Sequence, residues 1–241
     1  MSLRMQSHTP PVSSVSAIRT PLEYWVFDLD NTLYPASCSL FPQIDVKMRQ
    51  FIAEALHLPL DEAFVLQKRY YHEYGTTLRG LMLAHGIEPD EFLHYVHDID
   101  CSVLAPDPRL AAAVAALPGR RLIYTNGSER HAENVLERLG MLALFDGIFD
   151  IRAANFIPKP NAEAYGLMMK RLDVDPALAA MFEDIPRNLL PAAEAGMTTV
   201  WVKEDGHSHW TDEGDPASMP HIHHVTEDLA GWLEGWVKAQ G

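Results

Sequence analysis

Residues 24–32 read Tyr-Trp-Val-Phe-Asp-Leu-Asp-Asn-Thr, and this stretch decides the class of fold. Its first four residues are apolar and aromatic, a pattern typical of a short strand buried on both faces of a sheet. The run then ends on two carboxylates, Asp28 and Asp30. Open α/β sheets bind their ligands beyond the carboxyl ends of the strands, so we expect these acidic residues to lie in a site.

Downstream of Gly119 the sequence alternates between apolar runs and amphipathic stretches. The expected strands cover residues 122–125, 147–151, 179–183 and 199–202, with an edge strand at 222–225. The expected helices cover residues 109–117, 129–139, 162–172, 189–195 and 226–238. Repeated strand–helix units predict an α/β fold with a parallel sheet and right-handed crossovers.

Between the first strand and this region the pattern is helical. Ile44, Met48 and Phe51 recur at three- and four-residue spacing, as on one face of an amphipathic helix. Further helical stretches are expected at residues 61–74, 78–85 and 89–97. We therefore predict a helical domain at residues 39–102, inserted into an α/β core formed by residues 21–38 and 103–241.

The chain has a large excess of acidic residues. Its 241 residues include 33 Asp and Glu against 19 Lys and Arg, which gives a net charge of −14. This excess argues against binding to nucleic acid polymers or to an anionic membrane surface, because both are themselves polyanions. By the same reasoning, net charge alone disfavours an anionic small substrate.

Other whole-chain features favour a cytoplasmic protein. No apolar run approaches the ~18 residues of a membrane-spanning helix. Residues 1–20 are polar and lack the apolar segment of a secretory signal, so we expect them to form a disordered tail. The chain has two cysteines, Cys38 and Cys101, which are too few for a disulfide framework. We expect a monomer or a homodimer.

Five histidines near the C-terminal end were considered as zinc ligands. They are His207, His209, His221, His223 and His224. Neither a cysteine nor a suitably spaced carboxylate completes a zinc site there, and the region is rich in Gly, Pro and Ser. We therefore predict a solvated loop.

Four groups of polar residues are expected at strand ends or at the start of a helix. They are Asp28 with Asp30, Thr125 with Asn126 and Gly127, Lys159 between two prolines, and Glu183 with Asp184. Two carboxylates as close as Asp28 and Asp30 repel each other, and a divalent cation relieves that repulsion. Carboxylate oxygens suit Mg²⁺, and Asp184 can add one from another strand.

Each group also has an ordinary structural explanation. Taken singly, the two aspartates are typical of a solvated turn, Asn126-Gly127 of a tight turn, and Lys159 of an exposed surface side chain. A strand-end hydroxyl, an amide and a backbone N–H also suit phosphate oxygens. The occurrence of all four groups in one α/β layout favours phosphate chemistry over four unrelated turns.

The segments that carry these groups resemble the four motifs of the haloacid dehalogenase (HAD) superfamily. They read FDLDNTLYP at residues 27–35, YTNGS at 124–128, PKP at 158–160 and EDIPRNL at 183–189. The resemblance implies a Rossmann-like core, and the inserted helices resemble the α-helical cap of that superfamily. It further implies a phosphatase that hydrolyses small phosphate monoesters with the help of Mg²⁺.

The resemblance also implies a role for each motif residue. Asp28 corresponds to the nucleophile that becomes an aspartyl-phosphate, and Asp30 to the general acid and base whose backbone carbonyl also binds Mg²⁺. Thr125, Asn126 and the backbone of Gly127 correspond to the phosphate-binding groups, and Lys159 to the motif-three lysine. Asp184 corresponds to a metal ligand, and Glu183 to a residue that holds metal-bound water or supports Lys159.

Three shorter segments resemble the HAD-type pyrimidine 5′-nucleotidase family. They are YGTTLRG at residues 74–80, YVHDID at 95–100 and PDP at 106–108. This resemblance implies a nucleoside 5′-monophosphate as substrate. Tyr34, Thr76, Thr77 and Arg79 are then candidates for contacts with base or ribose, although the threonines can equally cap a helix.

Other functions remain open at this stage. A phosphosugar mutase shares the two motif-one aspartates, and a phosphatase of another small metabolite such as phosphoglycolate shares all four motifs. A haloacid dehalogenase is disfavoured by Asp30 and Asp184, because such enzymes lack the acid–base aspartate and need no Mg²⁺. A binding protein without activity is disfavoured because every catalytic position is filled.

Overall fold

The computed structural model describes residues 21–203 and 218–240. The tail predicted at residues 1–20 and the histidines at positions 207 and 209 lie outside the described residues. No disulfide joins Cys38 to Cys101. Among the helices that the structure describes, none is long and apolar enough to cross a membrane.

The centre of the molecule is a six-stranded sheet in which every pairing is parallel. The strands are β1 (Tyr24–Phe27), β2 (Arg120–Tyr124), β3 (Gly147–Phe149), β4 (Ala179–Glu183), β5 (Thr198–Val202) and β6 (His224–Thr226). Their order across the sheet is β3-β2-β1-β4-β5-β6. Strand β1 therefore lies between β2 and β4, and Val26 is in register with Leu122 on one side and Met181 on the other.

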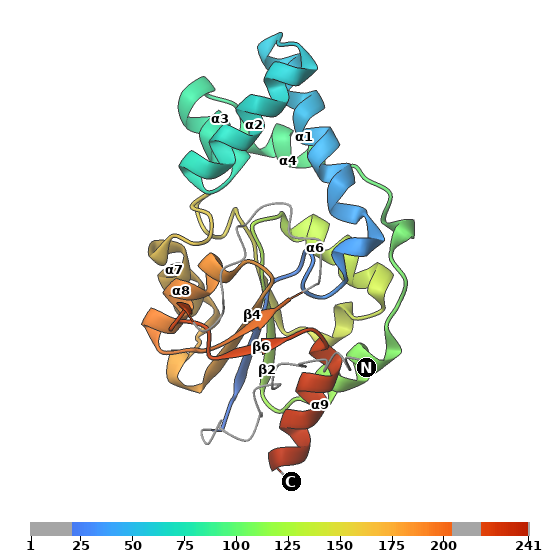
Figure 1. The fold of residues 1–241 in the computed structure, drawn as a ribbon, viewed down its shortest axis with the longest axis vertical. Coiled ribbons are helices and arrows are strands. Elements are labelled where there is room, and N and C mark those ends of the chain that lie inside the picture. Colours follow the sequence, from blue (N-terminus) through green and yellow to red (C-terminus); the bar gives the residue numbers. More distant parts are fainter. Residues whose placement is uncertain (1–20, 204–217, 241) are drawn as a thin grey trace, which may run out of the picture.

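Helices cover both faces of the sheet (Figure 1). One face carries α5 (Pro108–Ala115), α6 (Glu129–Leu139) and α9 (Leu229–Gln240), and the other carries α7 (Ala162–Leu172) and α8 (Pro186–Ala195). Because side chains alternate along a strand, Trp25 and Phe27 join the first hydrophobic cluster and Val26 the second. The predicted α/β fold with a parallel sheet is confirmed.

The remaining long helices form a unit of their own beyond the ends of the strands (Figure 1). They are α1 (Leu40–Leu56), α2 (Leu60–Tyr74), α3 (Thr77–His85) and α4 (Pro89–Val96). Residues such as Phe51, Leu81 and Phe92 give these helices a separate hydrophobic cluster. The close approach of α2 and α3 requires Gly80, because a Cβ there would lie 2.4 Å from the ring of Tyr70. The exact limits of the helical domain at 39–102 stay a prediction.

Several element boundaries differ from the sequence-based expectation, and the two largest differences are at the starts of helices. Helix α8 begins at Pro186 rather than 189, because proline fits the first turn of a helix, where its missing N–H is not needed. The last helix begins at Leu229 rather than 226. Thr226 belongs to β6, and its hydroxyl accepts a hydrogen bond from the Asp228 amide (3.1 Å) in the turn that separates strand from helix.

Candidate active site

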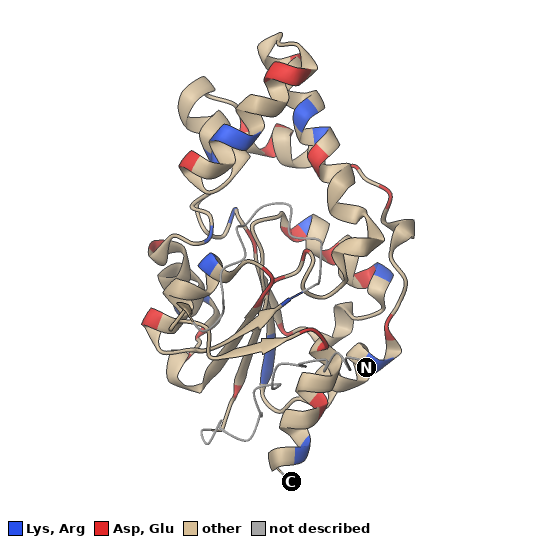
Figure 2. Cartoon of the chain, viewed as in Figure 1, with Lys and Arg blue, Asp and Glu red and all other residues tan. Residues whose placement is uncertain are grey.

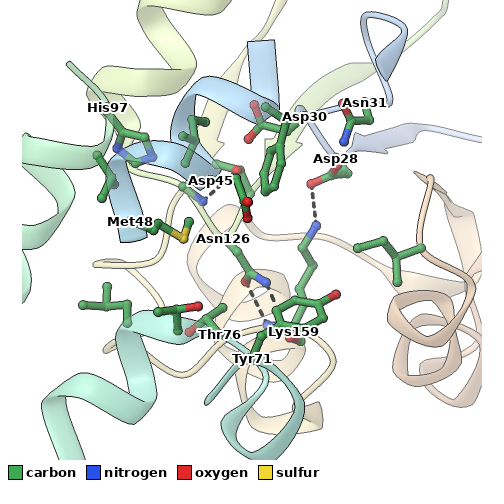
Figure 3. Close-up of a pocket in the computed structure, with 18 of the residues that line it drawn as sticks. Asp28, Asp30, Asn31, Asp45, Met48, Tyr71, Thr76, His97, Asn126 and Lys159 are labelled. Atoms are coloured by element: carbon green, nitrogen blue, oxygen red, sulfur yellow. Dashed lines mark hydrogen bonds and ion pairs between the residues drawn. The ribbon is translucent and has the colours of Figure 1, made fainter. Parts of the chain in front are cut away.

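The loops that follow β1, β2 and β4 meet at one edge of the sheet, below the helices α1–α4. They enclose a cavity of about 150 Å³ that is lined from both sides, by strand-end residues such as Asp28 and by helical residues such as Met48. Figure 3 shows the two sets of side chains around this space. In Figure 2 acidic positions gather where the central strands end.

A buried ion-pair cluster lies at the base of the cavity. The ammonium of Lys159 donates to Asp28 Oδ1 (2.6 Å), to Glu183 Oε1 (2.8 Å) and to the carbonyl of Tyr124 (3.1 Å). The Lys159 side chain is 1% exposed, so this pairing is shielded from water. Asn188 donates to the same oxygen of Glu183 (2.6 Å).

The backbone around Lys159 is fixed by the loop after β2. The side-chain oxygen of Asn126 accepts a hydrogen bond from the Lys159 amide (2.9 Å). Asn126 therefore ties two of the predicted motifs together. Thr125 is buried, and its hydroxyl accepts from the Gly127 amide (2.9 Å). A Cβ at Gly127 would lie 3.2 Å from both the Thr125 hydroxyl and the His131 ring, so this close approach suits glycine.

Burial and mutual repulsion perturb the carboxyl groups. Burial raises the pKa of Asp28 to about 7, aided by the charges of Glu183 and Asp30 and opposed by Lys159. Burial and the neighbouring Glu183 and Asp28 raise the pKa of Asp184 well above its usual range. For Glu183 burial acts in the same direction, but the charge of Lys159 together with hydrogen bonds from Asp184, Lys159 and the Ile185 amide outweighs it, and the net pKa is lowered.

The Lys159 ammonium keeps its proton. Burial by itself lowers the pKa of Lys159, but the charges of Asp28 and Glu183 outweigh that effect and raise the pKa above its usual value. The cluster therefore holds one fixed cation and more carboxylates than that cation can neutralise.

This excess of carboxylate fits a divalent cation. One oxygen from each of Asp28, Glu183 and Asp184 lies within 4.8 Å of the others, and three hard oxygen donors suit Mg²⁺ or a similar ion. A bound cation stabilises the charged form of each carboxyl group and would reverse the raised pKa values. The expected ligands were the carboxylates of Asp28 and Asp184 and the backbone carbonyl of Asp30. The structure brings Glu183 into the cluster, while the Asp30 carboxylate points elsewhere.

The Asp30 carboxylate is held by residues on the other side of β1. Its Oδ1 lies 2.5 Å from the Tyr34 hydroxyl and 2.8 Å from His131 Nε2. Burial raises the pKa of Asp30, but His131 and the two hydrogen bonds outweigh it, and the net pKa is lowered. His97 stacks on His131 with the ring centroids 4.3 Å apart, and burial beside that ring lowers the pKa of His97 to about 3.

Sequence reasoning did not single out His131 or His97 as site residues. His131 is buried on α6, three residues after the helix cap Ser128. One feature of the sequence could have indicated His131. It is a histidine on the apolar face of an amphipathic helix, directly after a predicted phosphate-binding motif.

The four residues expected to contact the substrate divide into two pairs. Thr76 and Thr77 line the cavity, and Thr76 also caps α3 by accepting from the Arg79 amide (3.2 Å). Tyr34 is buried and bonded to Asp30, away from the cavity wall. Arg79 lies in a separate surface hollow, where it donates to the Phe156 carbonyl (3.5 Å).

The histidines considered for zinc make other contacts. His223 Nδ1 accepts from the Thr199 amide (3.0 Å), and His221 Nε2 lies 3.1 Å from the Pro186 carbonyl. Within residues 21–203 and 218–240, the Asp28–Glu183–Asp184 cluster is the one group of ligand atoms placed to hold a metal.

The chain is similar to known proteins in sequence and in fold. A family model described as a hydrolase, haloacid dehalogenase-like hydrolase, matches residues 25–196. Phosphate metabolism protein 8 of Saccharomyces cerevisiae is 34% identical over 134 residues, which are 51% of this chain and 41% of that protein. Validoxylamine A 7′-phosphate phosphatase of Streptomyces hygroscopicus is 35% identical over 81 residues, or 32% of this chain and 36% of that protein. These matches thus span less than half of either relative.

One curated relative is matched over most of its length. Enolase-phosphatase E1 of Frankia alni is 26% identical over 225 residues, which cover 81% of this chain and 92% of that protein. Among solved structures, a HAD phosphatase from Thermococcus onnurineus has a TM-score of 0.59 at 19% identity, covering 91% of this chain and 98% of that one. The HAD-hydrolase YfnB from Bacillus subtilis, bound to magnesium, has a TM-score of 0.56 at 16% identity, with 90% and 99% covered. These structural likenesses concern the fold.

Proposed function

The chain belongs to the haloacid dehalogenase-like hydrolases, and from that premise we propose a Mg²⁺-dependent phosphohydrolase that cleaves small phosphate monoesters through an aspartyl-phosphate. We further propose a nucleoside 5′-monophosphate as the substrate. One observation carries the reaction type: the Asp28 carboxylate lies at a strand end, 2.6 Å from the buried Lys159 ammonium and within the Asp28–Glu183–Asp184 cluster. The names of the relatives, all phosphatases or phosphate-related proteins, support the same class.

In this mechanism Asp28 is the nucleophile. Lys159 holds Oδ1, which leaves Oδ2 as the oxygen that attacks phosphorus, with Thr32 as its hydrogen-bond donor at 3.2 Å. Thr125 and Gly127 line the cavity beside it, and the Thr125 hydroxyl, whose oxygen accepts from the Gly127 amide, can donate its own proton to a phosphoryl oxygen. Because phosphoryl transfer depends mainly on position and charge, these fixed groups account for most of the catalysis that the chain itself supplies.

Mg²⁺ would be held by Asp28, Asp184 and Glu183, with the Asp30 backbone carbonyl as a further ligand. When bound, it neutralises charge on the phosphate oxygens and lets a dianionic ester approach the carboxylates. The YfnB structure, which shares the fold, is bound to magnesium.

The helical wall of the cavity supports a nucleoside as the leaving group. Its apolar members are Phe41, Ile44, Met48, Leu78, Phe92, Leu93 and Val96. The Asp45 carboxylate lies among them, held by Gln67 Nε2 (2.8 Å) and Lys68 Nζ (2.7 Å). An apolar surface suits a flat base, and a fixed carboxylate accepts from hydroxyl or amino groups. Phosphoglycolate fits less well, because its own carboxylate would face Asp45.

A phosphate-release screen tests this proposal. Nucleoside 5′-monophosphates, sugar phosphates and phosphoglycolate would each be tried with Mg²⁺ and with EDTA. We expect nucleotide turnover with Mg²⁺ only, lowered by at least about 10³-fold in Asp28→Asn. Interconversion of glucose phosphates without phosphate release would instead identify a mutase. An absence of turnover with every monoester would reject the proposed reaction.

The compartment is also a proposal. Two cysteines without a disulfide between them suit a reducing cytoplasm, where thiols persist. A small phosphate ester is the partner that the site suits.

A further inference from the structure

Two buried donors converge on a single oxygen of Asp30. The Tyr34 hydroxyl lies 2.5 Å from Oδ1, and His131 Nε2 lies 2.8 Å from the same atom. The His131 side chain is 0% exposed and that of Asp30 is 15% exposed. The contact is therefore part of the interior of the protein.

The surroundings of His131 fix which nitrogen carries its proton. Across the part of the chain that the structure describes, Nδ1 of His131 is buried with no hydrogen-bond partner. A buried N–H without an acceptor costs more than a buried lone pair without a donor. The tautomer with its proton on Nε2 is therefore favoured, and His131 donates to Asp30.

The ring of His131 is held by a residue from the helical unit. His97 follows α4 directly and stacks on His131 at 4.3 Å, with 11° between the ring planes. Its Nδ1 lies 2.9 Å from the Ser128 hydroxyl, which also accepts from the His131 amide (3.3 Å) as the cap of α6. One serine thus positions both rings.

We propose that His131 is a positioning residue for the acid–base step: with Tyr34 it holds Oδ1 of Asp30, so that Oδ2 exchanges the proton with the leaving group and with water. This inference rests on the proposed function. Within the described residues no hydrogen bond occupies Oδ2, and Asp30 lines the cavity. The stacked His97 links this arrangement to the helices that cover the site.

The proton balance of the two half-reactions fits this arrangement. In the first, the bond from Asp28 to phosphorus forms, the ester P–O bond breaks, and a proton on Asp30 Oδ2 passes to the departing alkoxide; this step requires Asp30 to take up that proton in the substrate complex, because its pKa is lowered in the unliganded protein. In the second, water attacks phosphorus, the bond to Asp28 breaks, and the water proton returns to Asp30 Oδ2. If the Asp30 carboxyl group could rotate freely, either oxygen could face the leaving group. In part of the molecules the proton would then lie on the oxygen that faces away from it.

Two substrates whose leaving groups differ in their need for a proton distinguish this positioning role from a purely structural one. His131→Phe keeps a ring to stack on His97 and removes the donor. We expect kcat/KM for a nucleoside 5′-monophosphate to fall about 10- to 100-fold, because general acid catalysis is weakened. For p-nitrophenyl phosphate, whose phenolate departs without a proton, we expect a fall of less than about 3-fold. His131→Gln keeps a donor and should recover part of the loss.

Three further variants complete the experiment. Tyr34→Phe removes the second donor to the same oxygen. We expect it to lower the ratio of kcat/KM for the nucleotide to kcat/KM for p-nitrophenyl phosphate, as His131→Phe does. This variant keeps the inference testable even if His131→Phe folds poorly. In an Asp30→Asn background, His131→Phe should leave the ratio unchanged. The same substitution at the exposed His94 of α4 should leave both rates unchanged.

The outcomes distinguish this inference from the proposed function. Equal losses with both substrates in His131→Phe and Tyr34→Phe would overturn the positioning role while leaving the phosphatase intact. A wild-type protein that releases phosphate from neither substrate would reject the proposed function itself.

Discussion

At the scale of single residues, Lys159 and Asp28 determine the electrostatics of the site. Lys159 contacts two carboxylates and is nearly inaccessible to water, so its charge is fixed in place. One cation cannot neutralise Asp28, Glu183 and Asp184 together. The metal-free site therefore retains protons on its carboxyl groups, and metal must displace them.

We predict that the affinity for Mg²⁺ rises with pH between 6 and 8. Burial raises the pKa of Asp28 from 3.8 to about 7, so below pH 7 the cation competes with a proton that leaves when it binds. The affinity should rise by up to about tenfold per pH unit for each proton released. Calorimetric Mg²⁺ titrations at pH 6, 7 and 8 measure this, with the exposed Asp61→Asn as a control that keeps the same profile.

The sign of the stability change follows from the same pKa. The folded metal-free protein holds a proton on Asp28 that the unfolded chain has lost above its ordinary pKa of 3.8. The contribution of Asp28 to the free energy of unfolding is therefore greatest below pH 3.8, and it is lost as the pH rises to about 7. Mg²⁺ should raise the melting temperature more at pH 8 than at pH 6, and a pH-independent effect of Mg²⁺ would contradict the prediction.

Sequence alone predicts some of these contacts and misses others for a physical reason. Asp28 and Asp184 end neighbouring parallel strands, so their convergence follows from the order of the strands. The contact between Asp30 and His131 joins residues 101 positions apart and depends on how α6 packs against the sheet. No local pattern encodes that packing, and periodicity identified His131 only as a residue on a helix.

At the scale of elements, hydrophobic patterns predict the existence of helices and strands better than their ends. The helices at residues 129–139 and 162–172 have the predicted limits because a cap residue and a stop signal bracket each pattern. The predicted strand at 222–225 became β6 (His224–Thr226), because its limits depend on pairing with β5. Tertiary contacts, rather than local preference, decide such edges.

We predict that Asp107→Ala destabilises the protein without changing its activity. The Asp107 carboxylate caps α5 by accepting from the amides of Arg109 (2.9 Å) and Leu110 (3.0 Å). Loss of a cap of this kind costs about 1 kcal/mol, which urea unfolding would measure. Asp107 does not line the site cavity, so kcat should stay the same.

Asp107→Asn is the matched control, because its side-chain oxygen still accepts from both amides. It should recover most of the stability. An equal loss in both variants would assign the effect to the charge rather than to the cap. Arg109 itself pairs with Asp228 and Glu234 on the surface, where such ion pairs contribute little.

At the scale of the whole molecule, the charge of −14 acts over longer distances than the site does. Figure 2 shows acidic and basic positions spread over both the sheet domain and the helices. A dianionic ester approaching the protein is repelled by the net charge until it comes within a few ångströms of Lys159 and the bound cation. The net charge therefore repels the substrate only while it is far from the site. Binding is decided by the contacts inside the cavity.

We predict that moderate salt raises kcat/KM. Raising NaCl from 20 to 200 mM screens the long-range repulsion but hardly affects contacts inside the cavity, so kcat/KM for a nucleotide should rise about twofold. Initial rates at fixed Mg²⁺ measure this. A fall in kcat/KM would mean that the local positive field extends into solvent and attracts the substrate.

The central place of β1 has a consequence for how the protein is made. The strand β1, which directly precedes Asp28, leaves the ribosome before the other five strands, yet one of its two neighbours, β4, begins only at Ala179. Until that segment has been translated, β1 has an unpaired edge with Trp25 and Phe27 beside it, the kind of surface that chaperones bind. The proposed activity, which would need Glu183 and Asp184 as well as Asp28, is thus expected late in synthesis, and a nascent chain that ends before β4 should hydrolyse no phosphate ester.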